Sequence, residues 1–140
     1  MVLLFLRPGE LRCPCWCEID LDHSTRVVPA ERDRSRGMVG MKMREAHTVP
    51  LSRQALEIFP ALHAYSGHGE LAFPNRNDHS RSISDNTINS TLRALSYAND
   101  EASAHGFRAT AASALAEMKY RQEVIDASLA HRERSEVLGA

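Results

Sequence analysis

The sequence lacks any long apolar run. Its most hydrophobic stretch, MVLLFL at residues 1–6, ends at Arg7-Pro8-Gly9, whereas a membrane span needs about 20 consecutive apolar residues. The stretch is also too short for the apolar region of a signal peptide, and no cleavage site follows it. We therefore expect no membrane partner.

Cysteine is scarce, and its three copies lie together at Cys13, Cys15 and Cys17. Three thiols cannot all pair, and this spacing does not build a disulfide scaffold, so we expect a reducing, cytoplasmic setting. On a strand this spacing would place all three thiols on one face. No fourth ligand of matching spacing follows, so we expect packed or free thiols rather than a metal site.

The chain also lacks a large net charge, since 17 basic residues face 18 acidic ones. This balance is not typical of a general polyanion binder. The charge is nevertheless uneven, because residues 26–53 contain seven Lys or Arg and only three acidic residues. That segment is a candidate for a phosphate contact, although a solvated basic loop remains the alternative.

The length of 140 residues and a hydrophobic fraction of 43% fit one globular domain. The patterning predicts an α+β fold that is mainly α, with a small three-stranded antiparallel sheet near the N-terminus. We expect strands at residues 16–21, 26–30 and 47–51, and a mobile, basic connection at 32–40. We expect the end of an apolar helix before Pro8 and a helical turn starting there, then helices at about 53–63, 84–95, 105–119 and 122–129.

Particular residues sharpen these assignments. Ser52 is a typical N-cap, and Pro60 should kink or split the helix that follows. The apolar residues of the 84–95 helix, and Val124 in the last predicted helix, are expected to face the core. Four histidines outside any ligand pattern are expected at the surface or in loops: His47, His63, His68 and His79.

His105 and Arg108 form the most informative pair. A separation of three residues places both on one face at a helix start, where free N–H groups and the helix dipole favour an anion. Taken alone, the pair is more typical of a histidine that caps or packs and a solvated arginine than of an anion site.

Further motifs give this pair a context. Arg7 lies in LLFLRPGELR, Lys42 in MKMREAHTVPLS and His131 in SLAHRER, with AHGFRATA between them around His105 and Arg108. In this order the motifs resemble the catalytic domain of tyrosine recombinases of the phage-integrase branch. The resemblance covers nearly the whole chain and implies a helical recombinase core.

The resemblance implies DNA integration or recombination by strand breakage and rejoining through a 3′-phosphotyrosyl link. It assigns Arg7 and Arg108 to a phosphate clamp, and Lys42 to protonation of the leaving 5′-oxygen. His105 would donate to an oxygen or accept the tyrosine proton, and His131 would be a second donor. It implies no metal or other cofactor, no small-molecule substrate, and double-stranded DNA of the attachment-site type and other recombinase protomers as partners.

The sequence departs from this pattern where the nucleophile is expected. The tyrosine should follow His131 by nine or ten positions, but position 140 is Ala. Residues 1–140 are therefore expected to be a partial catalytic domain, truncated at both ends, without the upstream DNA-holding domain. Residues 33–41 resemble an insertion ahead of Lys42. Tyr120 ends a predicted helix, where packing is its expected role.

Three hypotheses follow. The first is a recombinase catalytic domain, and the second is a catalytically incompetent remnant that binds DNA weakly or not at all. The third is a small helical DNA-binding module built from residues 105–119 and 122–129, which lacks a basic recognition helix. The resemblance favours the first for the family and the second for this polypeptide.

Overall fold

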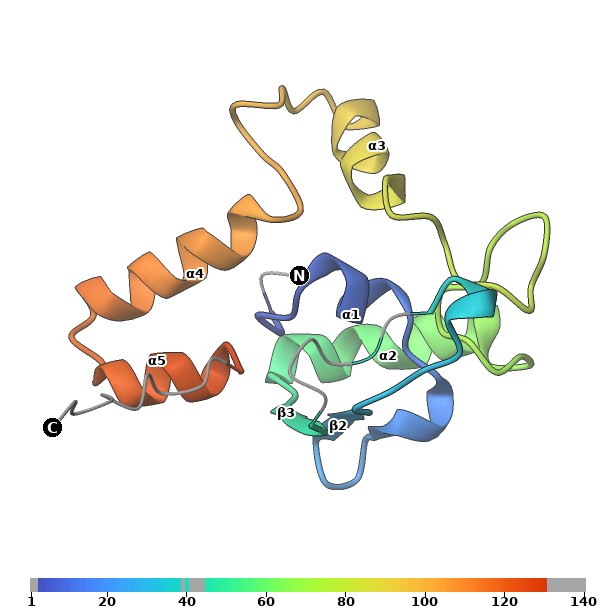
Figure 1. Ribbon diagram of the computed structural model, residues 1–140, viewed down its shortest axis with the longest axis horizontal. Coiled ribbons are helices and arrows are strands. Elements are labelled where there is room, and N and C mark those ends of the chain that lie inside the picture. Colours follow the sequence, from blue (N-terminus) through green and yellow to red (C-terminus); the bar gives the residue numbers. More distant parts are fainter. Residues whose placement is uncertain (1–2, 39, 41–44, 131–140) are drawn as a thin grey trace, which may run out of the picture.

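A computed structural model describes residues 3–38, 40 and 45–130 of the 140-residue chain. Within these ranges the chain forms a small sheet and five α-helices (Figure 1), which confirms the predicted class. The α-helices are α1 (Pro8–Arg12), α2 (Arg53–Ser66), α3 (Thr87–Ala94), α4 (Gly106–Glu117) and α5 (Gln122–Ser128). The strands are β1 (Ile19–Asp20), β2 (Thr25–Val28) and β3 (His47–Pro50), and 3-10 turns span Trp16–Glu18 and Arg34–Arg36.

The sheet has the predicted topology. Its order is β1-β2-β3, and each strand is antiparallel to its neighbour. The first strand is shorter than predicted because Trp16 is bound to the end of α2 and to the segment that follows it. Its N–H donates to the Glu70 carbonyl at 2.9 Å and its indole Nε1 to the Ser66 carbonyl at 3.2 Å. Residues 16–18 therefore turn away from the sheet.

The inner face of the sheet carries the first core cluster. Burial alternates along β2 and β3, as expected for strands with one covered face. Val28 and Val49 pack there against Leu6, which immediately precedes Arg7. The sheet thus supports the segment that leads into α1.

The expectation of an apolar helix ending before Pro8 is wrong, whereas α1 does begin at Pro8. Residues 3 and 4 form a turn, and Phe5 has a φ of 52°, outside the helical region. So short an apolar segment cannot nucleate a helix. The Phe5 carbonyl instead accepts a hydrogen bond from Arg108, and this contact supports the unusual backbone conformation.

Helix α2 begins as predicted and continues further. The Ser52 hydroxyl accepts from the Ala55 N–H at 3.2 Å, a typical N-cap. Pro60 does not split the helix, which runs unbroken to Ser66. Phe59 is buried, and its ring meets Trp16 edge-on at a centroid distance of 6.3 Å. This packing holds the helix against the body, whereas Pro60 is exposed.

The described part of the 32–40 connection is fastened to the body. The Arg32 side chain is buried and pairs with Glu18 at 2.5 Å, and Glu18 also pairs with buried Arg26 at 3.4 Å. Arg36 pairs with Glu70 at 2.8 Å. Arg32 is therefore committed to an internal ion pair and does not face a phosphate, whereas residues 39 and 41–44 lie outside the described segments.

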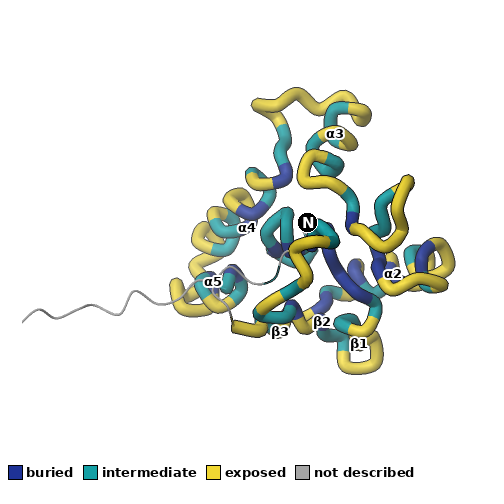
Figure 2. Tube along the Cα trace, turned by 45° about the vertical axis from the view of Figure 1, so that its right-hand side comes forward, coloured by how far each residue is buried: buried dark blue, intermediate teal, exposed yellow. Residues whose placement is uncertain are grey.

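The helices of the second half of the chain are less covered than predicted. Helix α3 has no buried residue, so its expected place in the core is wrong, and it stands apart in Figure 2. Asn89 of α3 accepts from the Ala104 N–H at 2.8 Å, which ties this helix to the segment before α4. Helix α4 packs on α5, whose Ile125 is buried while Val124 faces outward, against expectation. No helix in the described ranges is long and apolar enough to cross a membrane.

Candidate phosphate-binding site

The first element of the site is the turn that carries Arg7. Arg7 occupies the N-cap of α1, and its Nη1 donates to Glu10 Oε1 at 3.0 Å. The backbone N–H of Arg7 donates to Glu10 Oε2, also at 3.0 Å. Glu10 is only 2% exposed, whereas the Arg7 side chain is 24% exposed. The buried carboxylate thus fixes Arg7 in place while leaving part of its guanidinium accessible.

A second buried cation supports this turn from below. Arg26 Nη2 donates to the Glu10 backbone carbonyl at 2.7 Å. Burial is the largest influence on Arg26 and lowers the pKa of its guanidinium, while the neighbouring carboxylate of Glu18 opposes that shift. A cation at this carbonyl also complements the C-terminal end of the short helix. Arg26 therefore has a structural role under the Arg7 turn.

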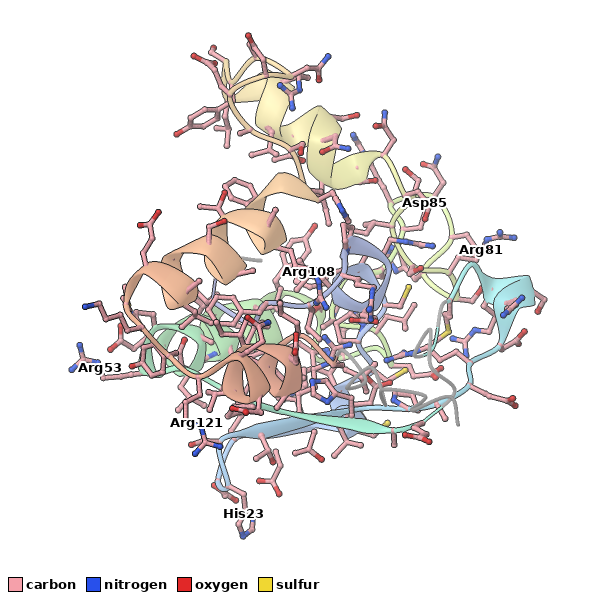
Figure 3. All side chains as sticks on the ribbon, turned by 60° about the vertical axis from the view of Figure 1, so that its left-hand side comes forward. His23, Arg53, Arg81, Asp85, Arg108 and Arg121 are labelled. Atoms are coloured by element: carbon pink, nitrogen blue, oxygen red, sulfur yellow. The ribbon has the colours of Figure 1, made fainter. Side chains whose placement is uncertain are left out.

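Arg108 brings three distant segments together. It lies on α4 and is 8% exposed. Its two Nη atoms donate to the backbone carbonyls of Phe5 and Leu129. In Figure 3 Arg108 lies inside the body of the molecule, whereas Arg53 and Arg121 project at its edge.

Arg7 and Arg108 lie within electrostatic reach of each other. The pKa of Arg108 is lowered, first by burial and then by the positive charge of Arg7, with Glu10 opposing the shift. Two arginines held this way offer paired donors and a permanent charge, which suit a phosphate oxygen. The sequence-predicted pair is therefore brought to one place, although 101 positions separate the two residues.

His105 occupies the N-cap of α4 and is exposed. Its side chain makes no capping hydrogen bond; the Ser103 hydroxyl instead accepts from the Gly106 N–H at 3.0 Å. The His105 carbonyl accepts from the Arg108 N–H at 3.2 Å. The histidine thus begins the helix that carries Arg108, and its ring remains accessible to a ligand.

The sequence analysis missed two residues of this site, Glu10 and His47. A glutamate three residues after the N-cap, with Pro at the first helical position, is a recognisable capping signal for Glu10. His47 was expected at the surface or in a loop, but it lies at the start of β3 and is half-buried. Burial lowers the pKa of His47, Glu10 raises it, and Arg108 and Arg7 lower it further.

Comparison with known proteins identifies the family. A sequence model of a protein family, described as "Phage integrase family", matches residues 1–139 of this chain. The chain belongs to the phage integrase family. It is 42% identical over 145 residues to the integrase of Enterobacteria phage P4, an alignment that covers 99% of this chain and 33% of that protein. It is 37% identical over 145 residues to "Putative protein IntB" of Escherichia coli (strain K12), covering 99% of this chain and 37% of that protein.

The phage-integrase chain thus spans about a third of the length of these curated relatives. Among solved structures it is similar to XerA recombinase, with a TM-score of 0.72 and 17% identity over 93% of this chain and 46% of the other. It is also similar to the Tn1549 transposon integrase in complex with a circular intermediate DNA, with a TM-score of 0.67 and 12% identity over 93% and 48%. These likenesses confirm the recombinase fold that the motifs predicted.

Two predicted site residues of this integrase-family chain, Lys42 and His131, lie outside the described residues. The structure does describe residues near each of them in sequence. Strand β3 begins at His47, five residues after Lys42. The carbonyl of Leu129, two residues before His131, accepts a hydrogen bond from Arg108. Both predicted positions therefore flank segments of the site, and their roles remain predictions.

The three tyrosines lie in other segments. Tyr65 is near the end of α2, Tyr97 follows α3, and Tyr120 lies between α4 and α5. All three are at least half exposed, so the packing role expected for Tyr120 is wrong. The backbone N–H of Tyr120 closes the turn after α4 by donating to the Leu115 carbonyl at 3.1 Å.

The cysteine cluster does not form one face. Cys13 and Cys15 are buried, and Cys17 is exposed. The 3-10 turn at Trp16–Glu18 breaks the strand alternation on which that expectation depended. Across the described residues, no group of three His, Cys, Asp or Glu side chains is arranged to hold a metal ion.

Proposed function

We propose that residues 1–140 form part of the catalytic domain of a site-specific DNA recombinase, in which Arg7 and Arg108 clamp a DNA phosphodiester. The proposal is carried by one observation: the Arg108 guanidinium donates to the Phe5 carbonyl, two residues before Arg7 at the N-cap of α1. Two guanidinium groups kept this close favour an anion between them, because the anion removes their mutual repulsion. Burial and the charge of Arg7 both lower the pKa of Arg108, and Glu10 opposes them.

The proposed chemistry is a phosphoryl transfer. A tyrosine hydroxyl attacks the phosphorus, the bond to the 5′-oxygen breaks, and a 3′-phosphotyrosyl link and a free 5′-hydroxyl result. Arg7 and Arg108 stabilise the charge on the non-bridging oxygens. Lys42 protonates the leaving 5′-oxygen, His105 assists proton transfer, and His131 is a second donor.

The proposed partners are double-stranded DNA of the attachment-site type and further recombinase protomers. The names of the relatives support this assignment, since several are integrases and one similar structure is a complex with DNA. The three cysteines are free in the structure, and free thiols support a cytoplasmic place of action.

Binding is tested by fluorescence anisotropy with a labelled DNA duplex at several salt concentrations. We expect Arg108→Ala and Arg7→Ala each to weaken binding at least about tenfold, because each removes a charge-assisted contact. The matched control is Arg53→Ala, since Arg53 is exposed on α2. Equal affinity of all four proteins would contradict the phosphate clamp, and melting curves of each variant separate lost binding from lost folding.

Strand cleavage is tested separately with a duplex nicked near the cleavage site. Such a substrate traps a covalent protein–DNA adduct if a tyrosine attacks. The second hypothesis, a non-catalytic DNA-binding remnant, is favoured by the positions of Tyr65, Tyr97 and Tyr120 outside the segments that build the site. Binding without an adduct supports the remnant, and an adduct supports the enzyme.

A further inference from the structure

A cavity of about 570 Å³ is lined in part by Phe5, whose carbonyl accepts the hydrogen bond from Arg108. Its walls come from the first described residues, from β3 and from the end of α5. They are mostly apolar, with Leu4, Phe5 and Val49 among them. His47 is the one titratable side chain among the described residues that line this cavity.

The backbone places His47 beside the Arg7 turn. His47 pairs with Val28 across the sheet, and Val28 packs against Leu6, the residue before Arg7. Phe5, which shares the cavity wall with His47, accepts the hydrogen bond from Arg108. Within the described ranges the structure gives the His47 imidazole no hydrogen-bond partner, so its ring nitrogens are available to a ligand.

The charges around His47 come from two helices. Arg7 at the N-cap of α1, Glu10 within α1 and Arg108 on α4 all act on His47 electrostatically. The α5 residues of the cavity wall, Ala127 and Ser128, carry no charge. Burial and the two arginines outweigh Glu10, so the pKa of His47 lies below its ordinary value and the free protein holds this histidine neutral at pH 7.

We propose that His47 is a third contact to the phosphate held by Arg7 and Arg108. This inference rests on the proposed function. A neutral imidazole donates one N–H to a non-bridging oxygen, and a protonated one adds a charge. The resemblance described above assigns no role to His47, which lies within the MKMREAHTVPLS motif between Lys42 and the VPLS segment.

The geometry has a measurable consequence. An anion bound between the arginines cancels the positive charge that disfavours protonated His47. Binding therefore raises the pKa of His47 and is coupled to proton uptake. Affinity for DNA must then increase as the pH falls through the interval between the bound and free pKa values, by about tenfold for a shift of one pKa unit.

The test is an NMR titration of the histidine ring signals of the full chain, with and without a short DNA duplex, with inorganic phosphate as a second probe. We expect the signal assigned to His47 to titrate at a higher pH when the duplex is present. His68, exposed in a loop, is the internal control. An unchanged His47 titration in a sample that binds the duplex would overturn the inference and leave the proposed function intact.

A variant gives an independent measurement. His47→Gln keeps an N–H donor but cannot be protonated, so its DNA affinity should lose the part of the pH dependence due to His47. His105→Gln is the comparison, because it removes the exposed imidazole at the N-cap of α4 by the same substitution. Identical pH profiles for the parent protein and His47→Gln would refute the role of His47, whereas absence of binding in the parent protein would refute the proposed function itself.

Discussion

The guanidinium of Arg108 donates to the backbone carbonyl of Phe5, 103 residues earlier in the chain. Its other Nη atom donates to the carbonyl of Leu129. One side chain thus fixes the segment that leads to Arg7 and the end of α5. Arg108 therefore has a structural role, in addition to the phosphate contact proposed for it.

The substitution Arg108→Lys tests whether the two hydrogen bonds of the guanidinium, rather than its positive charge alone, stabilise the fold. An ammonium group keeps the positive charge but cannot reach both carbonyls as the planar fork does. We expect the free energy of unfolding to fall by about 1–3 kcal/mol, because one buried carbonyl loses its partner. Urea denaturation measures the change, with Arg53→Lys as the exposed control. Equal urea midpoints for Arg108→Lys and Arg53→Lys would mean that the guanidinium hydrogen bonds of Arg108 do not stabilise the fold.

Glu10→Gln tests the buried carboxylate under Arg7. The amide keeps an acceptor for the Arg7 N–H but removes the charge that holds its guanidinium. We expect a loss of about 1–3 kcal/mol in the free energy of unfolding. The control is Glu57→Gln on the exposed side of α2. A result in which both variants unfold alike is incompatible with a stabilising Glu10.

The cysteines should differ in reactivity. Burial, assisted by Glu18, raises the pKa of the Cys15 thiol to about 12, so almost no thiolate forms near neutral pH. Cys17 is exposed. We expect iodoacetamide to label Cys17 first in the folded protein, as followed by mass spectrometry of peptides. Urea-unfolded protein is the control, and equal labelling of both thiols in the native state would contradict the structure.

Pro60→Ala should stabilise the protein. Pro60 is exposed in the interior of α2 and cannot donate to the carbonyl four residues earlier. Alanine restores that hydrogen bond, and we expect a gain of about 2 kcal/mol after the entropy lost from the unfolded chain is subtracted. Pro74→Ala, outside any helix, should give no such gain. Thermal melting compares the two, and a lower Tm for Pro60→Ala would disprove the expectation.

Stability should fall on mild acidification because of His47. Its folded pKa lies below the ordinary value of 6.5, so the unfolded chain binds more protons in the interval between the two values. The contribution is complete above pH 6.5 and is lost as the pH falls toward the folded pKa. Urea midpoints across this interval should drop less in His47→Gln than in the parent protein.

The sequence predicted those parts of the fold that local chemistry determines. The Ser52 cap and the antiparallel sheet are confirmed, because each depends on residues close together in the chain or on strand alternation. The motif order also led to Arg7 and Arg108, which the structure brings together. Their catalytic roles, with those of Lys42, His105 and His131, remain predictions.

Long-range contacts produced the differences. The indole of Trp16 donates a hydrogen bond to the Ser66 carbonyl, and residues 16–18 form a 3-10 turn outside the sheet. Cys17 lies in this turn and is therefore separated from the two buried thiols. His47 is half-buried on β3, and the charges that influence its pKa come from Arg7, Glu10 and Arg108, all distant in sequence. No local pattern around positions 16 or 47 contains these distant partners.

Glu18 neutralises two buried arginines at once, Arg26 and Arg32. Replacing Glu18 alone leaves two buried cations without their carboxylate. Breaking a buried ion pair in this way typically lowers the free energy of unfolding by about 3–5 kcal/mol for each pair. Natural variation at these three positions should therefore be concerted: homologues that replace the acid are expected to replace both bases as well, and chains carrying the single change should be rare.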